Sequence, residues 1–274
     1  MRITLTILGL VFLITACNKN NESITTQPNN EEKVIVKAES TYIFNLVESI
    51  TYAEALTHDD WNSSATAVIP LKLDAYIPEN TLLKRPAFVL IHGGGLDFGS
   101  RTDPNIVNMA NYFASRGWVV FSLDYRLKSD KGTVPSDWEQ NISDEDVLKM
   151  YPANRDVKVA IRWLYANSET YNIDTDYITG AGGSAGALLS ISLGVTDAED
   201  YTNELSVTED PTLSTTNINQ PAKVHTIIDF WGGEAYVKIL ELLYGLQRFD
   251  SNDQQFLLLT VQMIILLTLV PQKH

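Results

Sequence analysis

The feature of the sequence that most constrains its fold is an alternation of strand-like and helix-like segments between residues 67 and 246. Residues 86–92 (PAFVLIH) and 117–125 (GWVVFSLDY) are nearly continuous apolar runs, which are typical of strands buried on both faces. Residues 106–116 and 153–168 repeat apolar side chains at helical spacing. Strands that alternate with helices predict an α/β fold, a doubly wound and mostly parallel sheet with helices on both faces.

The rest of this region continues the alternation. Residues 67–78 alternate apolar and polar side chains, as a half-exposed strand does. Two more strands are expected at residues 176–182 and 223–233, each followed by a helix, at residues 184–194 and 234–246. The predicted order is therefore strand, helix, strand, helix up to the end of the domain.

Two long polar stretches interrupt the alternation. Residues 128–150 are acidic and polar, and residues 196–221 are rich in Thr, Asn and Asp. Loops of this length inside compact domains are more often functional than idle. The first stretch is expected to be either a surface loop or part of a cap over a site.

Length, charge and cysteine content narrow the class of protein. The chain has 274 residues, a net charge of −14 and one cysteine. Its length fits one α/β domain, expected over residues 45–250. The acidic balance argues against a nucleic-acid partner, which would need clustered Lys and Arg. A single cysteine excludes an internal disulfide and a multi-cysteine metal site.

The first residues form a targeting segment. The apolar run at residues 5–14 is too short to span a bilayer comfortably. Residues 14–17 (ITAC) resemble a bacterial lipobox, in which cleavage leaves the cysteine as the lipid-bearing first residue; an ordinary signal peptide with a coincidental cysteine is the alternative. We predict a lipoprotein signal peptide over residues 1–16, lipid attachment at Cys17 and a polar tether over residues 17–44. The protein is then exported and anchored by lipid to a bacterial membrane, on its periplasmic or cell-surface face.

A G-x-S-x-G motif lies between an expected strand and an expected helix, at Gly182-Gly183-Ser184-Ala185-Gly186. Small residues let the chain turn sharply there and keep the approach to the serine open. Ser184 is therefore a candidate nucleophile. A glycine-rich turn without chemistry is the alternative.

A second motif, His92-Gly93-Gly94-Gly95, follows directly on a buried strand. Backbone N–H groups without side chains beside them can point at a developing oxyanion. A phosphate-cradling loop is the alternative, but no G-K-[ST] follows. Because both motifs occur in the expected order and context, together they predict a nucleophile and an oxyanion loop.

On these motifs the sequence resembles the α/β-hydrolase superfamily, in its carboxylesterase/lipase branch with an H-G-G-G oxyanion loop. It looks most like secreted bacterial esterases that act on small acyl or aryl esters. The resemblance runs from about Leu71 to Gly245 and includes "LDAYIP", "HGGGLDFGS", "LDYRL" and "DFWGG".

The resemblance implies a role for several residues. Ser184 would be the nucleophile of a serine carboxylesterase that works through an acyl-enzyme. Three backbone amides would form the oxyanion hole: those of Gly94, Gly95 and Ala185. His92 is mostly structural in this family, and Asp124 and Arg126 look like scaffold charges near the site. No metal or organic cofactor is implied, and Trp231 is either a pocket wall or a core residue.

The histidine that should act as base is hard to place. In this fold the triad follows the chain order serine, acid, histidine. His225 begins an expected strand, at the end remote from the nucleophile, and His274 is the last residue. His58 lies upstream in a loop. For the acid, Asp229 and Glu234 are candidates, although it more often follows the next strand, in a pattern like H-G-x-x-D.

The end of the chain suggests why no histidine stands where the family needs its base. Residues 256–270 carry no charge. A shifted reading frame can be built from the third base of each codon and the first two bases of the next. In this frame Met263-Ile264 must read GAT, which encodes aspartate. The codons from Gln255 onward can then encode "IFIVHGTND". We hypothesise a frame slip near Gln254, so that residues 251–274 are a frame-shifted tail and the fold is C-terminally truncated. A genuine apolar tail is the alternative.

These observations predict an esterase scaffold with little or no turnover. Two other classes stay open. One is an exopeptidase on the same fold, which would show acidic groups that grip a substrate amine. The other is a non-catalytic surface lipoprotein that keeps the hydrolase scaffold as a binding module.

Overall fold

The computed structural model describes residues 34–64, 66–250, 253 and 255–258. The predicted signal peptide, the predicted lipid attachment at Cys17 and residues 259–274 of the predicted frame-shifted tail lie outside the described residues, so these calls stay predictions.

The described chain contains seven strands and seven α-helices, with two short 3₁₀ turns. The strands are β1 (Phe44–His58), β2 (Thr66–Pro78), β3 (Arg85–Ile91), β4 (Val119–Leu123), β5 (Ile173–Gly182), β6 (Thr226–Asp229) and β7 (Gln255–Leu258). The helices are α1 (Pro104–Ala114), α2 (Ser136–Asn141), α3 (Glu145–Leu148), α4 (Met150–Ala166), α5 (Ser168–Tyr171), α6 (Ala185–Val195) and α7 (Ala235–Tyr244). The 3₁₀ turns are η1 (Lys128–Asp130) and η2 (Pro211–Thr215).

All seven strands form one sheet in the order β1-β2-β4-β3-β5-β6-β7. β1 pairs with β2 and β2 with β4 in antiparallel register, whereas the pairs from β4 through β3, β5 and β6 to β7 are parallel. β3 lies in the middle, and all seven of its residues are buried. The predicted α/β fold with a mostly parallel sheet is therefore confirmed.

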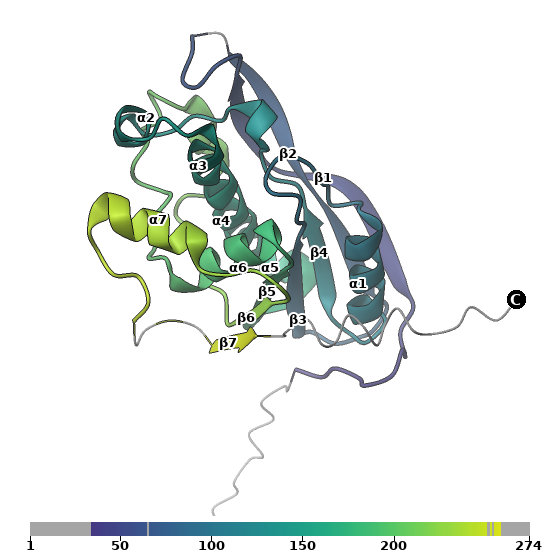
Figure 1. The fold of residues 1–274 in the computed structure, drawn as a ribbon. Coiled ribbons are helices and arrows are strands. Elements are labelled where there is room, and N and C mark those ends of the chain that lie inside the picture. The colour runs from purple at the N-terminus through teal and green to yellow at the C-terminus, as the bar shows by residue number, and fades with distance from the viewer. Residues whose placement is uncertain (1–33, 65, 251–252, 254, 259–274) are drawn as a thin grey trace, which may run out of the picture. The chain divides into compact units, whose positions relative to one another are not determined.

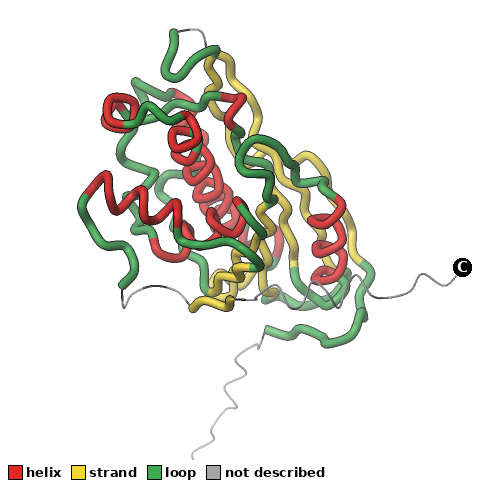
Figure 2. Tube along the Cα trace, in the orientation of Figure 1, coloured by secondary structure: helices red, strands yellow, loops and turns green. Residues whose placement is uncertain are grey.

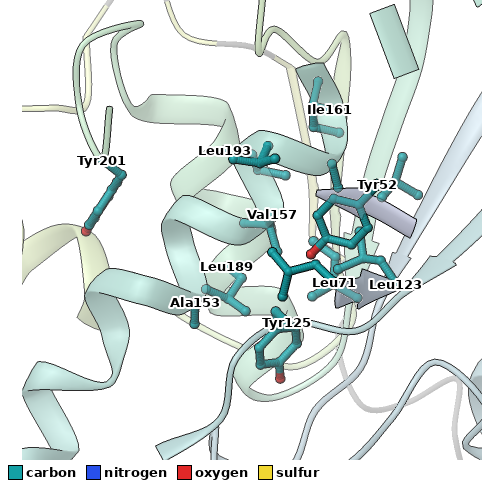
Figure 3. Packing of buried hydrophobic residues seen from close by; sticks show 14 of the residues in the cluster. Tyr52, Leu71, Leu123, Tyr125, Ala153, Val157, Ile161, Leu189, Leu193 and Tyr201 are labelled. Atoms are coloured by element: carbon teal, nitrogen blue, oxygen red, sulfur yellow. The ribbon is translucent and has the colours of Figure 1, made fainter. Parts of the chain in front are cut away.

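Helices cover both faces of this sheet, as Figures 1 and 2 show. On one face α1 packs Ile106, Ala110 and Ala114 against Phe88 and Val120 of the sheet. On the other face α4, α6 and α7 build the larger core. Figure 3 shows side chains of that core from α4, α6 and the sheet: Val157, Ile161, Leu189, Leu193, Leu71 and Leu123.

Helix α4 also binds the long polar stretch at residues 196–221 through buried basic side chains. Arg155, Lys158 and Arg162 project from α4 at helical spacing, and all three are buried. Arg155 pairs with Asp210 at 2.7 Å, and the Lys158 ammonium donates to the Asp200 carbonyl at 2.7 Å. Burial lowers the pKa of Lys158 to about 8. The stretch is thus held against the scaffold by buried cations.

Several sequence predictions need correction. The helix expected at residues 153–168 begins at Met150, and the strand expected at residues 223–233 has only four residues. β1 was not predicted, although it has 15 residues. Residues 128–150 contain η1, α2 and α3 rather than a plain loop.

Two features of the described residues concern membrane spans and metal sites. No helix there is long and apolar enough to cross a membrane. No group of three or more His, Cys, Asp or Glu side chains in the described part of the chain is placed to hold a metal ion.

Candidate active site

Ser184 stands at the sharp turn between β5 and α6. It is exposed and has the backbone angles φ 55° and ψ −125°, which few residues other than glycine adopt. Its backbone N–H donates to the Trp231 carbonyl at 2.8 Å. A strained serine fixed at a strand-to-helix turn is the geometry that the G-x-S-x-G motif predicts.

The glycines of the motif are required by close packing. A Cβ atom on Gly182 would overlap the backbone of Gly186. A Cβ atom on Gly186 would overlap the Ile91 carbonyl and lie 2.7 Å from the carbonyl oxygen of His92. The turn is therefore pressed against the end of β3, where the oxyanion loop begins.

The loop after β3 lies beside the serine. An ideal Cβ on Gly93 would be 3.5 Å from the Ser184 Cβ and 2.9 Å from the Gly183 carbonyl oxygen. Gly94 has φ 103° and Gly95 has φ 67°, so glycine is favoured at both positions. The structure thus brings together the two motifs that lie about ninety residues apart in the sequence.

The predicted oxyanion donors are available for a ligand. Among the described residues, the backbone N–H groups of Gly94 and Gly95 have no hydrogen-bond acceptor. Ala185 is the first residue of α6, so its N–H precedes the intrahelical hydrogen bonds. Unpaired N–H groups beside a serine suit a developing oxyanion.

His92 supports this loop. Its side chain is 1% exposed, and its Nδ1 lies 2.8 Å from the Gly93 carbonyl oxygen. The ring stacks on Tyr125 with 4.2 Å between ring centres. Burial lowers the pKa of His92, which favours the neutral ring. This environment agrees with the structural role that the resemblance implies.

Tyr125 was missed by the sequence reasoning. It is buried, and its hydroxyl donates to the His92 carbonyl at 2.9 Å and approaches the Gly93 carbonyl at 3.4 Å. Its position in "LDYRL", directly after a buried strand, is the only signal that the sequence offers.

The other described histidines lie elsewhere. His58 is at the end of β1, where its Nε2 is 3.0 Å from the Thr133 hydroxyl and its Nδ1 is 2.8 Å from the Ser63 carbonyl. The His225 N–H donates to the Ile178 carbonyl directly before β6 begins. This confirms His225 as a strand-start residue, at the end of the sheet opposite to Ser184. His274 is outside the described residues.

Asp124 and Arg126 are engaged in ion pairs. Asp124 accepts from the Arg101 backbone N–H at 2.7 Å and pairs with the Arg101 guanidinium. Arg126 is fully buried and forms a bidentate pair with Asp156, with N–O distances of 2.7 and 2.9 Å. Both contacts join parts of the scaffold, and structural pairing is the role expected of a buried charge such as Arg126.

The two acid candidates differ in environment. Asp229, the last residue of β6, is 8% exposed, and its Oδ1 has no hydrogen-bond partner among the described residues. Burial raises the pKa of Asp229, and the Gly232 N–H opposes this shift. Glu234 is exposed at the start of α7 and lies 3.8 Å from Lys238. Only Asp229 offers a buried, unpaired carboxylate oxygen.

Trp231 is exposed rather than part of the core. Its side chain is 46% exposed, and its ring covers Gly183, where a Cβ would lie 2.5 Å from the indole. The Trp231 side chain therefore lies beside the turn that carries Ser184, the candidate nucleophile.

Two cavities lie near histidines of the described chain but do not have Ser184 in their lining. One of about 240 Å³ lies behind the oxyanion loop and is lined by His92, Gly99 and Tyr125. A larger one of about 420 Å³ lies near His58 and Thr133. Ser184 lines neither cavity, and it is exposed.

The mostly parallel sheet and the strand–serine–helix turn define the α/β-hydrolase fold. A family model described as BD-FAE matches residues 73–260. This match covers more than half of the chain, and the chain belongs to that family.

Two curated proteins share parts of the sequence. Esterase LipC of Mycobacterium tuberculosis is 32% identical over 111 residues, which are 40% of this chain and 23% of LipC. Carboxylesterase 3B of Mus musculus is 33% identical over 128 residues, which are 45% of this chain and 20% of that protein. The chain thus matches less than a quarter of the length of either relative.

Solved structures show the same fold. Native esterase 2 of Thermogutta terrifontis has a TM-score of 0.51 at 19% identity, and the match covers 80% of this chain and 74% of that one. The same esterase phosphorylated by paraoxon has a TM-score of 0.52 at 20% identity, covering 82% and 75%. At this identity the likeness concerns the architecture of the sheet and its helices.

Proposed function

We propose that this protein is a serine carboxylesterase for small acyl or aryl esters. The observation that carries the proposal is the meeting of Ser184, at a strained and exposed turn, with the unpaired amides of Gly94 and Gly95. Membership of the BD-FAE family and the two named esterase relatives support the same class of reaction.

The proposed reaction has two steps. The Ser184 hydroxyl oxygen attacks the ester carbonyl carbon, its proton passes to a general base, and the carbonyl oxygen becomes an oxyanion held by the Gly94, Gly95 and Ala185 amides. Collapse of the tetrahedral species breaks the ester C–O bond, and the alcohol leaves with a proton. Water then attacks the acyl-serine and releases the carboxylic acid and the free serine.

Turnover by this chain is proposed to be weak. The three described histidines, His58, His92 and His225, have contacts with residues other than Ser184. Loss of the base from a serine triad lowers the rate by several orders of magnitude, although the oxyanion hole keeps some catalysis. The hypothesis of a frame slip near Gln254 concerns residues that are mostly outside the described part of the chain.

The test compares three proteins: the 274-residue chain, its Ser184→Ala variant, and the product of a gene repaired by one base near codon 254. A fluorophosphonate probe with intact-mass detection reports serine acylation, and p-nitrophenyl acetate reports turnover. We expect slow, Ser184-dependent labelling of the 274-residue chain and at least a hundredfold faster turnover after repair.

Three outcomes would contradict parts of the proposal. Ester hydrolysis that persists in Ser184→Ala would contradict the serine mechanism. Ser214→Ala is the control, since Ser214 is an exposed serine on η2, and it should leave the rate of hydrolysis unchanged. Fast turnover by the unrepaired chain removes the impairment. Preference for aminoacyl amides over esters in a matched panel would favour an exopeptidase.

A further inference from the structure

The oxyanion loop has a backbone conformation that needs support. Gly94, Gly95 and Leu96 have positive φ angles of 103°, 67° and 64° in succession. Leu96 is fully buried, and a side chain in this region carries a steric cost that glycine does not. Contacts from outside the loop must therefore keep this conformation.

One such contact comes from the segment before α4. The Lys149 ammonium donates to both carboxylate oxygens of Asp97, at 3.0 and 3.1 Å, and to the Asp146 carboxylate at 2.9 Å. The Lys149 side chain is 7% exposed, whereas that of Asp97 is 49% exposed. A buried cation with two carboxylate partners is a far more constrained contact than a surface ion pair.

Asp97 links this cation to the predicted oxyanion donors. Its backbone N–H donates to the Gly94 carbonyl at 3.0 Å and so closes the turn. Its Oδ2 is 3.3 Å from the ideal Cβ position of Gly95. The carboxylate that Lys149 holds therefore lies beside Gly95, one of the two glycines whose amides are unpaired.

We propose that Lys149 is a positioning residue for the oxyanion loop. By gripping the Asp97 carboxylate it keeps the Gly94 and Gly95 N–H groups aimed at the space beside Ser184. The effect on acylation rests on the proposed esterase function, but the effect on the loop does not. The contact couples the loop to the segment of residues 128–149. The same segment makes a second contact with the loop, because the Lys128 backbone N–H donates to the Leu96 carbonyl at 2.8 Å.

The chain contains a matched control for Lys149. The Lys128 ammonium bonds the same Asp146 carboxylate at 3.0 Å and lies 3.8 Å from Glu145, with 33% of its side chain exposed. Its side chain has no hydrogen bond to Asp97 among the described residues. Lys128→Met therefore removes the same charge from the same segment without removing the grip on the loop.

The first measurement is amide hydrogen exchange of the full chain, read on peptides that cover residues 92–98. We expect Lys149→Met to speed exchange in these peptides about tenfold, because local opening becomes easier, and Lys128→Met to leave it within twofold. Equal exchange in the two variants would overturn the proposal. If Lys149→Met speeds exchange throughout the chain, Asp97→Asn is the deciding variant, because it leaves Lys149 paired with Asp146. Unchanged exchange at residues 92–98 in Asp97→Asn would then overturn the proposal.

The second measurement separates positioning from simple stability. We expect the second-order rate constant for fluorophosphonate labelling of Ser184 to fall about tenfold in Lys149→Met, since displaced donors lose part of their effect, and to stay unchanged in Lys128→Met. Labelling that is equally fast in both variants would also overturn the proposal. A wild-type chain that is not labelled at all refutes the esterase function, while the exchange result still decides the role of Lys149.

Discussion

The two loops that flank Ser184 are held in different ways. The oxyanion loop is fixed from three directions: by the Tyr125 hydroxyl, by the Lys149 ammonium and by the Lys128 N–H. The turn between β6 and α7 on the other side is bound through its backbone, with the Trp231 carbonyl accepting from Ser184 at 2.8 Å. Trp231 in this turn is half exposed, and Asp229, directly before the turn, has a carboxylate oxygen with no hydrogen-bond partner among the described residues.

This difference separates two tasks. Donors that stabilise an oxyanion must keep their direction within narrow limits, so their loop is over-determined by contacts. A surface that meets the variable part of a substrate has no such requirement. We therefore expect substitutions on the oxyanion side to cost stability, and those on the β6–α7 side to cost little.

The largest effect is expected from Gly186→Ala. The added methyl group would overlap the Ile91 carbonyl, which is backbone and cannot rotate away. Overpacking of this kind should lower the free energy of unfolding by about 3 kcal/mol, measured by urea denaturation. Gly180→Ala is the control, because its Cβ would meet Ile227 at an ordinary 3.4 Å; a similar loss in both variants would show that the contact at β3 is not decisive.

A smaller effect is expected from Tyr125→Phe. The change deletes the hydroxyl that bonds the His92 carbonyl and leaves that buried acceptor unpaired. The free energy of unfolding should fall by about 1–2 kcal/mol, whereas Tyr177→Phe, at an exposed position, should leave it unchanged. A Tyr125→Phe variant as stable as the parent would contradict the view that this loop is braced.

The smallest effect, of opposite sign, is expected from Asp229→Asn. Burial raises the pKa of Asp229, so the native state binds its proton more tightly and loses stability as the pH rises from the unfolded value of about 4 through the raised one. Asparagine does not titrate and keeps an acceptor for the Gly232 N–H. At pH 7 the free energy of unfolding of the variant should exceed that of the parent by less than about 1 kcal/mol. This difference in the free energy of unfolding should disappear below about pH 4.

Thermal unfolding at pH 4 and pH 7 measures that gap. An Asn variant that is less stable at pH 7 would contradict the pKa argument. Fluorophosphonate labelling of the same variant has a separate meaning, because a large loss of Ser184 labelling would assign Asp229 as the triad acid.

The sequence predicted the parallel part of the sheet well. Residues 86–92 and 117–125 lie at β3 and β4 because buried strands need continuous apolar runs. β1 escaped prediction because register shifts between Val47 and Ile50 and between Thr51 and Ala53 break its alternation. The start of α4 was placed three residues late, since Met150 and Tyr151 have no helical capping signal before them.

The parts of the candidate site that depend on backbone geometry were predictable from the sequence. The parts that depend on pairs of side chains distant in the sequence were not. The motifs located Ser184 and the glycines because sharp turns and close approach demand small residues. Lys149 gave no signal, because its role depends on a contact with Asp97, 52 residues earlier in the chain. Contacts across such distances are set by the tertiary fold and leave no local pattern.

The hydrogen bond between Ser184 and Trp231 has one more consequence. Its acceptor is a main-chain carbonyl, which any amino acid at position 231 would supply. The backbone at this position can thus keep Ser184, the proposed nucleophile, in place while the side chain at position 231 varies. If the proposed esterase function holds, position 231 is a place where laboratory evolution can change substrate preference without disrupting the turn at Ser184.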